Sequence, residues 1–189
     1  MRAEYPALWD ALCTAAEPRG VFLEGSVENT ATGVRVCGIE VEGASLRAHL
    51  AHCSRALLFA ATLGAQVDRL IARYAAISVA QSYILDTMAS QMIEEFCDAE
   101  QEKLTQRTDG LFLRPRFSPG YGDVDMCVSS SILLALDAEK RIGLCMTRGG
   151  MLTPLKSVTA FIGLTPEKQS CHIHKCAACG KKDCVFRKE

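Results

Sequence analysis

Arg116-Phe-Ser-Pro-Gly-Tyr-Gly-Asp123 is the segment around which the rest of this chain can be organised. Within it, Ser118 to Tyr121 predicts a tight turn, because proline presets φ at the second position and glycine tolerates positive φ at the third. Arg116 supplies a permanently charged fork suited to a carboxylate, and Tyr121 supplies an aromatic face with a hydroxyl. Gly120 lets a ligand approach the backbone closely. We interpret the segment as a binding loop; a surface turn with an ordinary salt bridge is the alternative that spacing alone favours.

Length and composition describe a globular protein with a core of its own. The chain has 189 residues, of which 49% are hydrophobic and 23% charged, and its net charge is −1. These values favour one soluble domain, with two small lobes as the alternative. Since there is no basic excess, we expect no nucleic-acid or anionic-membrane partner. The longest apolar run, residues 56–65, is far too short to span a bilayer, and the first residues lack a signal-peptide layout, so we expect a cytoplasmic protein.

Hydrophobic periodicity predicts both helices and strands. The longest helical pattern runs from Ser78 to Gln106, and we take it as the central helix. On it, the neighbours Glu94 and Glu95 point about 100° apart, so both cannot face one ligand. A further helix is expected from about Ile132 to Gly143. The predicted strands are residues 21–28, 34–42, 55–61, 144–147 and 157–164, the third being a continuous apolar run that belongs in the middle of a sheet.

Four of the ten cysteines crowd into the end of the chain, as Cys171-x4-Cys176-x2-Cys179-x4-Cys184. A pair of cysteines two residues apart can grip one metal from a tight turn, and the flanking cysteines complete a four-coordinate shell. The opening spacing also matches the start of plant-type iron–sulfur sites, where the fourth cysteine is remote. The spacing therefore predicts a metal-binding tail, residues 166–189, and leaves zinc and an iron–sulfur cluster equally open.

The Arg116 segment resembles the S-adenosylmethionine-binding motif of the activation (reactivation) domain of cobalamin-dependent methionine synthase, and its fuller string is similar to small standalone relatives of that domain. The resemblance extends from Ser45 to Gly64, over the central helix to Asp98, and to Leu152-Thr-Pro-Leu-Lys-Ser-Val. It implies an α+β fold in residues 1–165, with a largely antiparallel sheet and packed helices. The histidine-bearing segment that follows the loop in the family is replaced by Val124-Asp-Met-Cys-Val-Ser, so contacts with a corrinoid partner are in doubt.

The resemblance also implies a ligand and roles for individual residues. Arg116 would hold the ligand carboxylate or the loop that binds it, and Gly120 and Tyr121 would approach the adenosyl part. The acidic residue that pairs with the ligand ammonium would be Glu94, with Glu95 as the fallback. In the family, S-adenosylmethionine and one electron, from flavodoxin or another reductant, restore methylcobalamin from cob(II)alamin.

The resemblance thus implies an accessory subunit that supports reductive methylation on a cobalamin-binding methyltransferase such as methionine synthase, with the cobalamin mainly on that partner. An iron–sulfur cluster in the tail would suit an electron relay. The main alternative is a small iron–sulfur or zinc protein for electron transfer or binding that serves a corrinoid protein. A self-sufficient S-adenosylmethionine-dependent methyltransferase is a third hypothesis.

Overall fold

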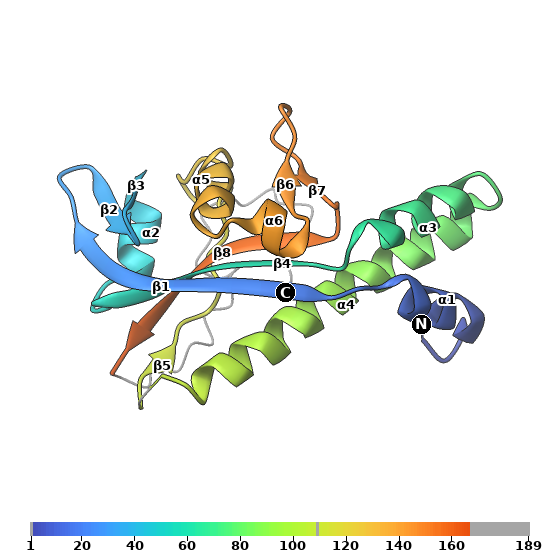
Figure 1. Ribbon diagram of the computed structural model, residues 1–189, viewed down its shortest axis with the longest axis horizontal. Helices are drawn as coiled ribbons and strands as arrows, with labels where there is room; N and C mark the ends of the chain where they lie inside the picture. The colour runs from blue at the N-terminus through green and yellow to red at the C-terminus, as the bar shows by residue number, and fades with distance from the viewer. Residues whose placement is uncertain (1, 109, 167–189) are drawn as a thin grey trace.

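The computed structural model describes residues 2–108 and 110–166. A six-stranded sheet with the order β3-β2-β1-β4-β8-β5 runs through the molecule, and each of its pairings is antiparallel. The helices lie on both sides of this sheet (Figure 1). The α+β class and the largely antiparallel sheet expected from the sequence are confirmed.

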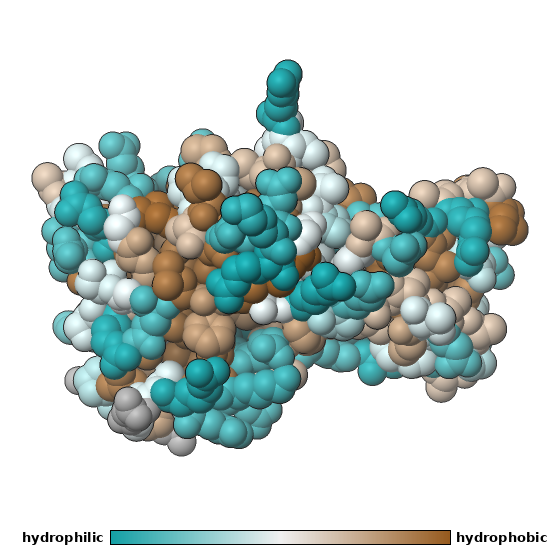
Figure 2. Space-filling view, in the orientation of Figure 1, coloured by the Kyte–Doolittle hydropathy of each residue, from teal (hydrophilic) through white to brown (hydrophobic). Residues whose placement is uncertain are grey.

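The strands of the large sheet are β1 (Arg19–Asn29), β2 (Gly33–Val36), β3 (Ile39–Glu42), β4 (Arg55–Thr62), β5 (Phe112–Leu113) and β8 (Ser157–Thr165). A separate hairpin of β6 (Cys145–Met146) and β7 (Leu152–Thr153) projects from the surface and ends in a narrow hydrophilic tip (Figure 2).

The apolar run predicted as an inner strand is β4, which lies between β1 and β8. Because successive side chains of a strand point to opposite faces, β4 contributes to two cores. Leu58 belongs to one cluster, whereas Leu57 and Phe59 belong to the other, and all three are at most 2% exposed. A strand buried on both faces has no polar alternation, which is why the run is continuous.

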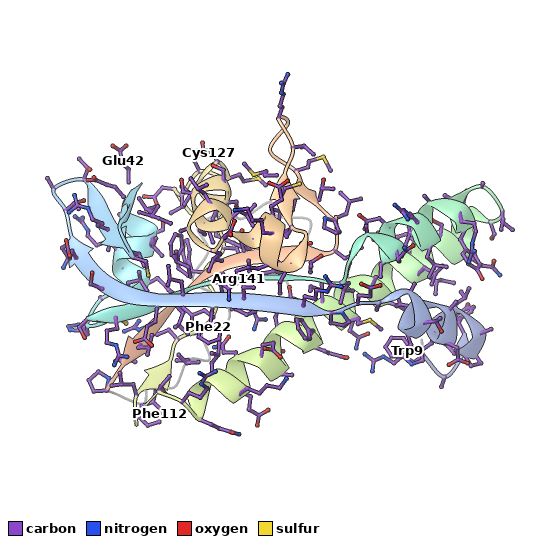
Figure 3. All side chains as sticks on the ribbon, in the orientation of Figure 1. Trp9, Phe22, Glu42, Phe112, Cys127 and Arg141 are labelled. Carbon is purple, nitrogen blue, oxygen red and sulfur yellow. The ribbon has the colours of Figure 1, made fainter. Side chains whose placement is uncertain are left out.

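One face of the sheet is covered by α1 (Pro6–Ala15), α3 (Ala65–Ala75) and α4 (Val79–Thr105), and the other by α2 (Ala44–His49), α5 (Val128–Ala135) and α6 (Ala138–Ile142). Figure 1 shows α5 and α6 above the sheet and α4 below it. Phe22 lies between β1 and α4, where it packs against the core of that side (Figure 3). The sheet therefore separates two cores, and a segment must pass its edge to connect them.

The central helix predicted from the sequence is α4. It begins after Ser78, whose hydroxyl accepts a hydrogen bond from the Gln81 amide at 3.4 Å. The core-facing side chains of α4 are Leu85, Met88, Ala89, Ile93, Cys97 and Leu104. Glu94 and Asp98 follow Ile93 and Cys97, so the carboxylates lie on a neighbouring, solvent-facing side of the same helix.

Two predicted elements are divided in the structure. The strand expected over residues 34–42 is a hairpin of β2 and β3, because Cys37 and Gly38 adopt φ angles of 50° and 83° and turn the chain. The helix expected up to Gly143 is split into α5 and α6 at Asp137, where φ is 49°. Positive φ at a residue other than glycine is uncommon, so hydrophobic periodicity does not reveal either break.

Candidate functional site

Arg116 is the centre of a polar cluster between α4 and the segment after β5. Its Nη2 donates to Glu94 Oε2 at 2.9 Å, and its Nη1 pairs with Asp98 Oδ1 at 2.8 Å. The same Nη1 donates to Gln101 Oε1 at 3.2 Å. Glu94, Asp98 and Gln101 follow one another at intervals of four and three residues along α4, so their side chains share one face of the helix. The structure thus brings two of the predicted ligand-binding residues, Arg116 and Glu94, into direct contact.

The direction of Arg116 is set by pairing with β8. Phe117 and Phe161 exchange two backbone hydrogen bonds of 2.9 and 2.8 Å. Neighbouring residues of an extended segment point to opposite faces. Phe117 packs against the α2 and α5 core, with its ring centroid 5.2 Å from that of His49. Arg116 consequently lies on the α4 side of the sheet, where its partners are.

The cluster combines a buried cation with exposed anions. The Arg116 side chain is 11% exposed, whereas those of Glu94 and Asp98 are 60% and 72% exposed. Burial acts to lower the pKa of Arg116, but hydrogen bonds to Asp98 and Glu94 and the nearby Cys97 raise it, and the net result lies above the ordinary value. Burial raises the pKa of the Cys97 thiol to about 12, so this thiol is neutral. Arg116 is a fixed positive charge, and its carboxylate partners are free to turn toward solvent.

A pocket of about 370 Å³ opens beside this cluster. It is lined by Asp98, Gln101, Glu102, Pro115 and Arg116. Its volume falls at the lower end of the range for small-molecule sites. Its walls supply one guanidinium, two carboxylates and an amide, so it is suited to a polar, charged group.

The turn predicted from Ser118 to Tyr121 is present. The Tyr121 amide donates to the Ser118 carbonyl at 3.3 Å, and Gly120 between them has a φ of 92°. A Cβ at Gly120 would lie 2.9 Å from Cγ of Met126. Only glycine enters this conformation without a steric cost. Tyr121 itself is 57% exposed, and neither Gly120 nor Tyr121 lines the pocket beside Arg116.

Asp123 fixes the far end of the loop to α2. Its carboxylate accepts hydrogen bonds from the amides of Ala44 at 2.6 Å and Ser45 at 3.0 Å. These backbone donors lower the pKa of the Asp123 carboxyl. Amides at the start of a helix have no partner within the helix, so the carboxylate satisfies them. The α2 helix is therefore capped by Asp123, a residue distant in the sequence.

Sequence reasoning missed Asp98 and Gln101, which share Arg116 with Glu94. Their spacing of four and seven residues from Glu94 is a signal that could have found them. Glu95, the predicted fallback, instead pairs with Arg2 at 2.5 Å, and the hydrogen bond from Arg2 lowers its pKa. Glu95 therefore belongs to a different contact, with the N-terminal segment.

The predicted metal ligands Cys171, Cys176, Cys179 and Cys184 lie outside the described residues. Within residues 2–108 and 110–166, no group of three or more His, Cys, Asp or Glu side chains is arranged to hold a metal ion. Of the cysteines in these ranges, Cys53 and Cys97 are buried, and Cys127 is exposed near the start of α5 (Figure 3). None of the helices in the described part of the chain has the length and apolar character that crossing a membrane requires.

Comparisons with protein-family models and with curated proteins give no match. Among solved structures, the chain is similar to one described as the MetH reactivation domain bound to AdoHcy, with a TM-score of 0.63 and 16% sequence identity. The match covers 88% of this chain and 67% of that chain. The two proteins share a fold, and the fold expected from the resemblance of the Arg116 segment is confirmed.

Proposed function

We propose that this chain binds S-adenosylmethionine and acts as a reactivation subunit for a cobalamin-dependent methyltransferase such as methionine synthase. The observation that carries the proposal is the contact of Arg116 with Glu94 beside a pocket, at the loop singled out by its sequence. A protein of the same fold holds AdoHcy, the demethylated form of this ligand. The amino-acid end of either ligand carries one carboxylate and one ammonium, which an arginine and a glutamate complement.

In this proposal each predicted residue has one task. Arg116 binds the ligand carboxylate through its guanidinium, and Glu94 accepts from the ligand ammonium. Gly120 would approach the adenosyl part through its backbone, and Tyr121 through its aromatic ring. In the overall reaction, cob(II)alamin on the partner gains one electron from flavodoxin or another reductant and takes a methyl group from S-adenosylmethionine, which leaves methylcobalamin and S-adenosylhomocysteine. This chain contributes binding and orientation of the methyl donor.

We further propose that residues 1–165 form the ligand-binding domain and residues 166–189 a metal-binding tail. Cys171, Cys176, Cys179 and Cys184 would hold an iron–sulfur cluster or zinc as thiolates. Metal analysis and the visible absorption of anaerobically purified protein distinguish the two, because only the cluster is coloured. A chain without bound metal, or with full metal content after Cys176→Ser and Cys179→Ser, would contradict this assignment.

Calorimetric titration with S-adenosylmethionine tests the ligand. We expect saturable binding by the intact chain, and binding at least tenfold weaker in Arg116→Ala. Arg35→Ala is the matched control, because Arg35 also bridges two carboxylates, those of Glu28 and Glu40, each at 3.3 Å. Arg35 lies on β2, away from the pocket. The proposal fails if the intact chain shows no saturable binding, alone or with a cobalamin-binding methyltransferase present.

The cysteine spacing favours a second function, electron transfer or metal binding in the service of a corrinoid protein. In that case the tail would be redox-active, and Arg116 would serve only to hold its loop against α4. A metal-loaded chain that does not bind S-adenosylmethionine would support this function over the first.

A further inference from the structure

The guanidinium that would bind the ligand carboxylate is already occupied. Asp98 and Gln101 share Nη1 of Arg116, and Glu94 takes Nη2. Arginine has five N–H donors, and these three contacts take both N–H groups of Nη1 and one of Nη2, so a ligand carboxylate that binds at Nη1 must replace Asp98 or Gln101. Asp98 and Gln101 line the pocket, whereas Glu94 does not. A ligand that enters from the pocket therefore meets the Asp98 side of the guanidinium first.

Asp98 is the partner that can leave most easily. Its side chain is 72% exposed, and it pairs with Arg116. An exposed carboxylate that gives up an ion pair is solvated by water, so the exchange costs little. Asp98 cannot move far, because α4 fixes its backbone. A displaced Asp98 consequently stays at the rim of the pocket as an unneutralised negative charge.

The charges around the pocket are unequal. Among the described residues that pair with Arg116 or line the pocket, Glu94, Asp98 and Glu102 carry negative charges and Arg116 carries the one positive charge. Lys103, the nearest lysine in the sequence, pairs with Glu100 instead. The surplus is therefore negative, and it favours a ligand that brings more positive than negative charge.

We propose that Asp98 makes this site selective for the sulfonium form of its ligand over the thioether form. This inference rests on the proposed function. Both forms carry one ammonium and one carboxylate, but S-adenosylmethionine has a sulfonium in addition, whereas S-adenosylhomocysteine is neutral overall. Asp98 competes with the carboxylate of both ligands for Arg116, and its displaced charge then attracts only the sulfonium form. The site would thereby release S-adenosylhomocysteine after methyl transfer.

The test is the ratio of the dissociation constants of the two ligands, measured by calorimetry at low salt. We expect the intact chain to prefer S-adenosylmethionine and Asp98→Asn to reduce that preference about fivefold, the size expected for one unit charge near a solvent-exposed site. Asp98→Glu retains the charge and should retain the preference. Asp137→Asn is the matched control, because Asp137 is 57% exposed and lies at the start of α6, on the opposite face of the sheet from α4.

Each result has one meaning. A ratio that is unchanged in Asp98→Asn, while both ligands still bind, overturns the role of Asp98 and leaves the proposed function intact. An equal change in Asp137→Asn would show an effect of net charge alone and would also overturn it. If the intact chain binds neither ligand, alone or with a cobalamin-binding methyltransferase present, the proposed function fails and this inference with it. Circular dichroism of each variant establishes that the fold is unchanged.

Discussion

Replacing Arg116 by methionine separates the structural role of this residue from its proposed binding role. Methionine keeps an unbranched apolar stem of similar reach and removes the charge. The ion pairs to Glu94 and Asp98 have carboxylates that are 60% and 72% exposed, and such screened pairs contribute about 0.5 kcal/mol each. We therefore expect Arg116→Met to lower the free energy of unfolding by about 1 kcal/mol, which for a chain of this size lowers Tm by about 2–4 °C.

Ligand binding should respond much more strongly than stability. A charge-assisted hydrogen bond to a ligand carboxylate contributes about 1.5–3 kcal/mol, so we expect S-adenosylmethionine to bind roughly tenfold to a hundredfold more weakly to Arg116→Met. Urea unfolding gives the stability, and calorimetry gives the affinity. Arg35→Met, which also releases two carboxylates, should show a similar or smaller loss of stability and unchanged affinity.

Two outcomes would refute this reasoning. A loss of stability above about 4 kcal/mol in Arg116→Met would have the size of a broken buried pair, and would mean that Arg116 holds the fold together. Unchanged affinity in a folded Arg116→Met protein would mean that the ligand does not use this guanidinium.

Two further predictions concern the loop itself. Because the pKa of Asp123 is lowered in the folded state, its ionised carboxylate stabilises the fold above the unfolded pKa near 3.9, and this contribution is lost as the pH falls through the lower folded pKa. In urea unfolding, Asp123→Asn should therefore lose stability less steeply than the unaltered chain below about pH 4. An identical pH dependence of the two proteins would contradict the link to α2. Gly120→Ala should destabilise the fold by about 1–2 kcal/mol, because φ at this position is 92° and the Met126 side chain must shift. Gly143→Ala is the control, because Gly143 has a φ of 69° and open space around it, so that variant measures only the cost of placing alanine at positive φ.

The sequence predicts the elements of this fold better than it predicts their ends. The run that forms β4 and the pattern that forms α4 both reflect burial, which periodicity records directly. The breaks lie at Cys37-Gly38 and at Asp137, where the backbone adopts positive φ. Cys37 and Asp137 are held there by the surrounding structure, since residues other than glycine favour negative φ. Local sequence carries little trace of them.

Some features of the candidate site follow from local sequence, and others depend on the tertiary structure. The turn at Gly120 follows from local chemistry, and it is present as predicted. The choice of Glu94 over Glu95 depends on the rotation of α4 about its axis, which the core-facing residues of the helix determine. The link from Asp123 to Ala44 and Ser45 joins residues 79 and 78 positions apart in the sequence. A contact of that range depends on how the sheet is wound and has no local signal.

The loop is attached to the rest of the fold at three points, which bears on how it would respond to the proposed ligand. At its start, Arg116 is held by α4 on one face of the sheet, and at its end Asp123 is held by α2 on the other. Between them, the backbone pair of Phe117 with Phe161 fixes the passage around the β8 edge. A ligand that takes Nη1 from Asp98 would loosen only the first of these attachments. The other two would hold Gly120 and Tyr121 in place, so an exchange of partners at Arg116 would leave the turn of the loop unchanged.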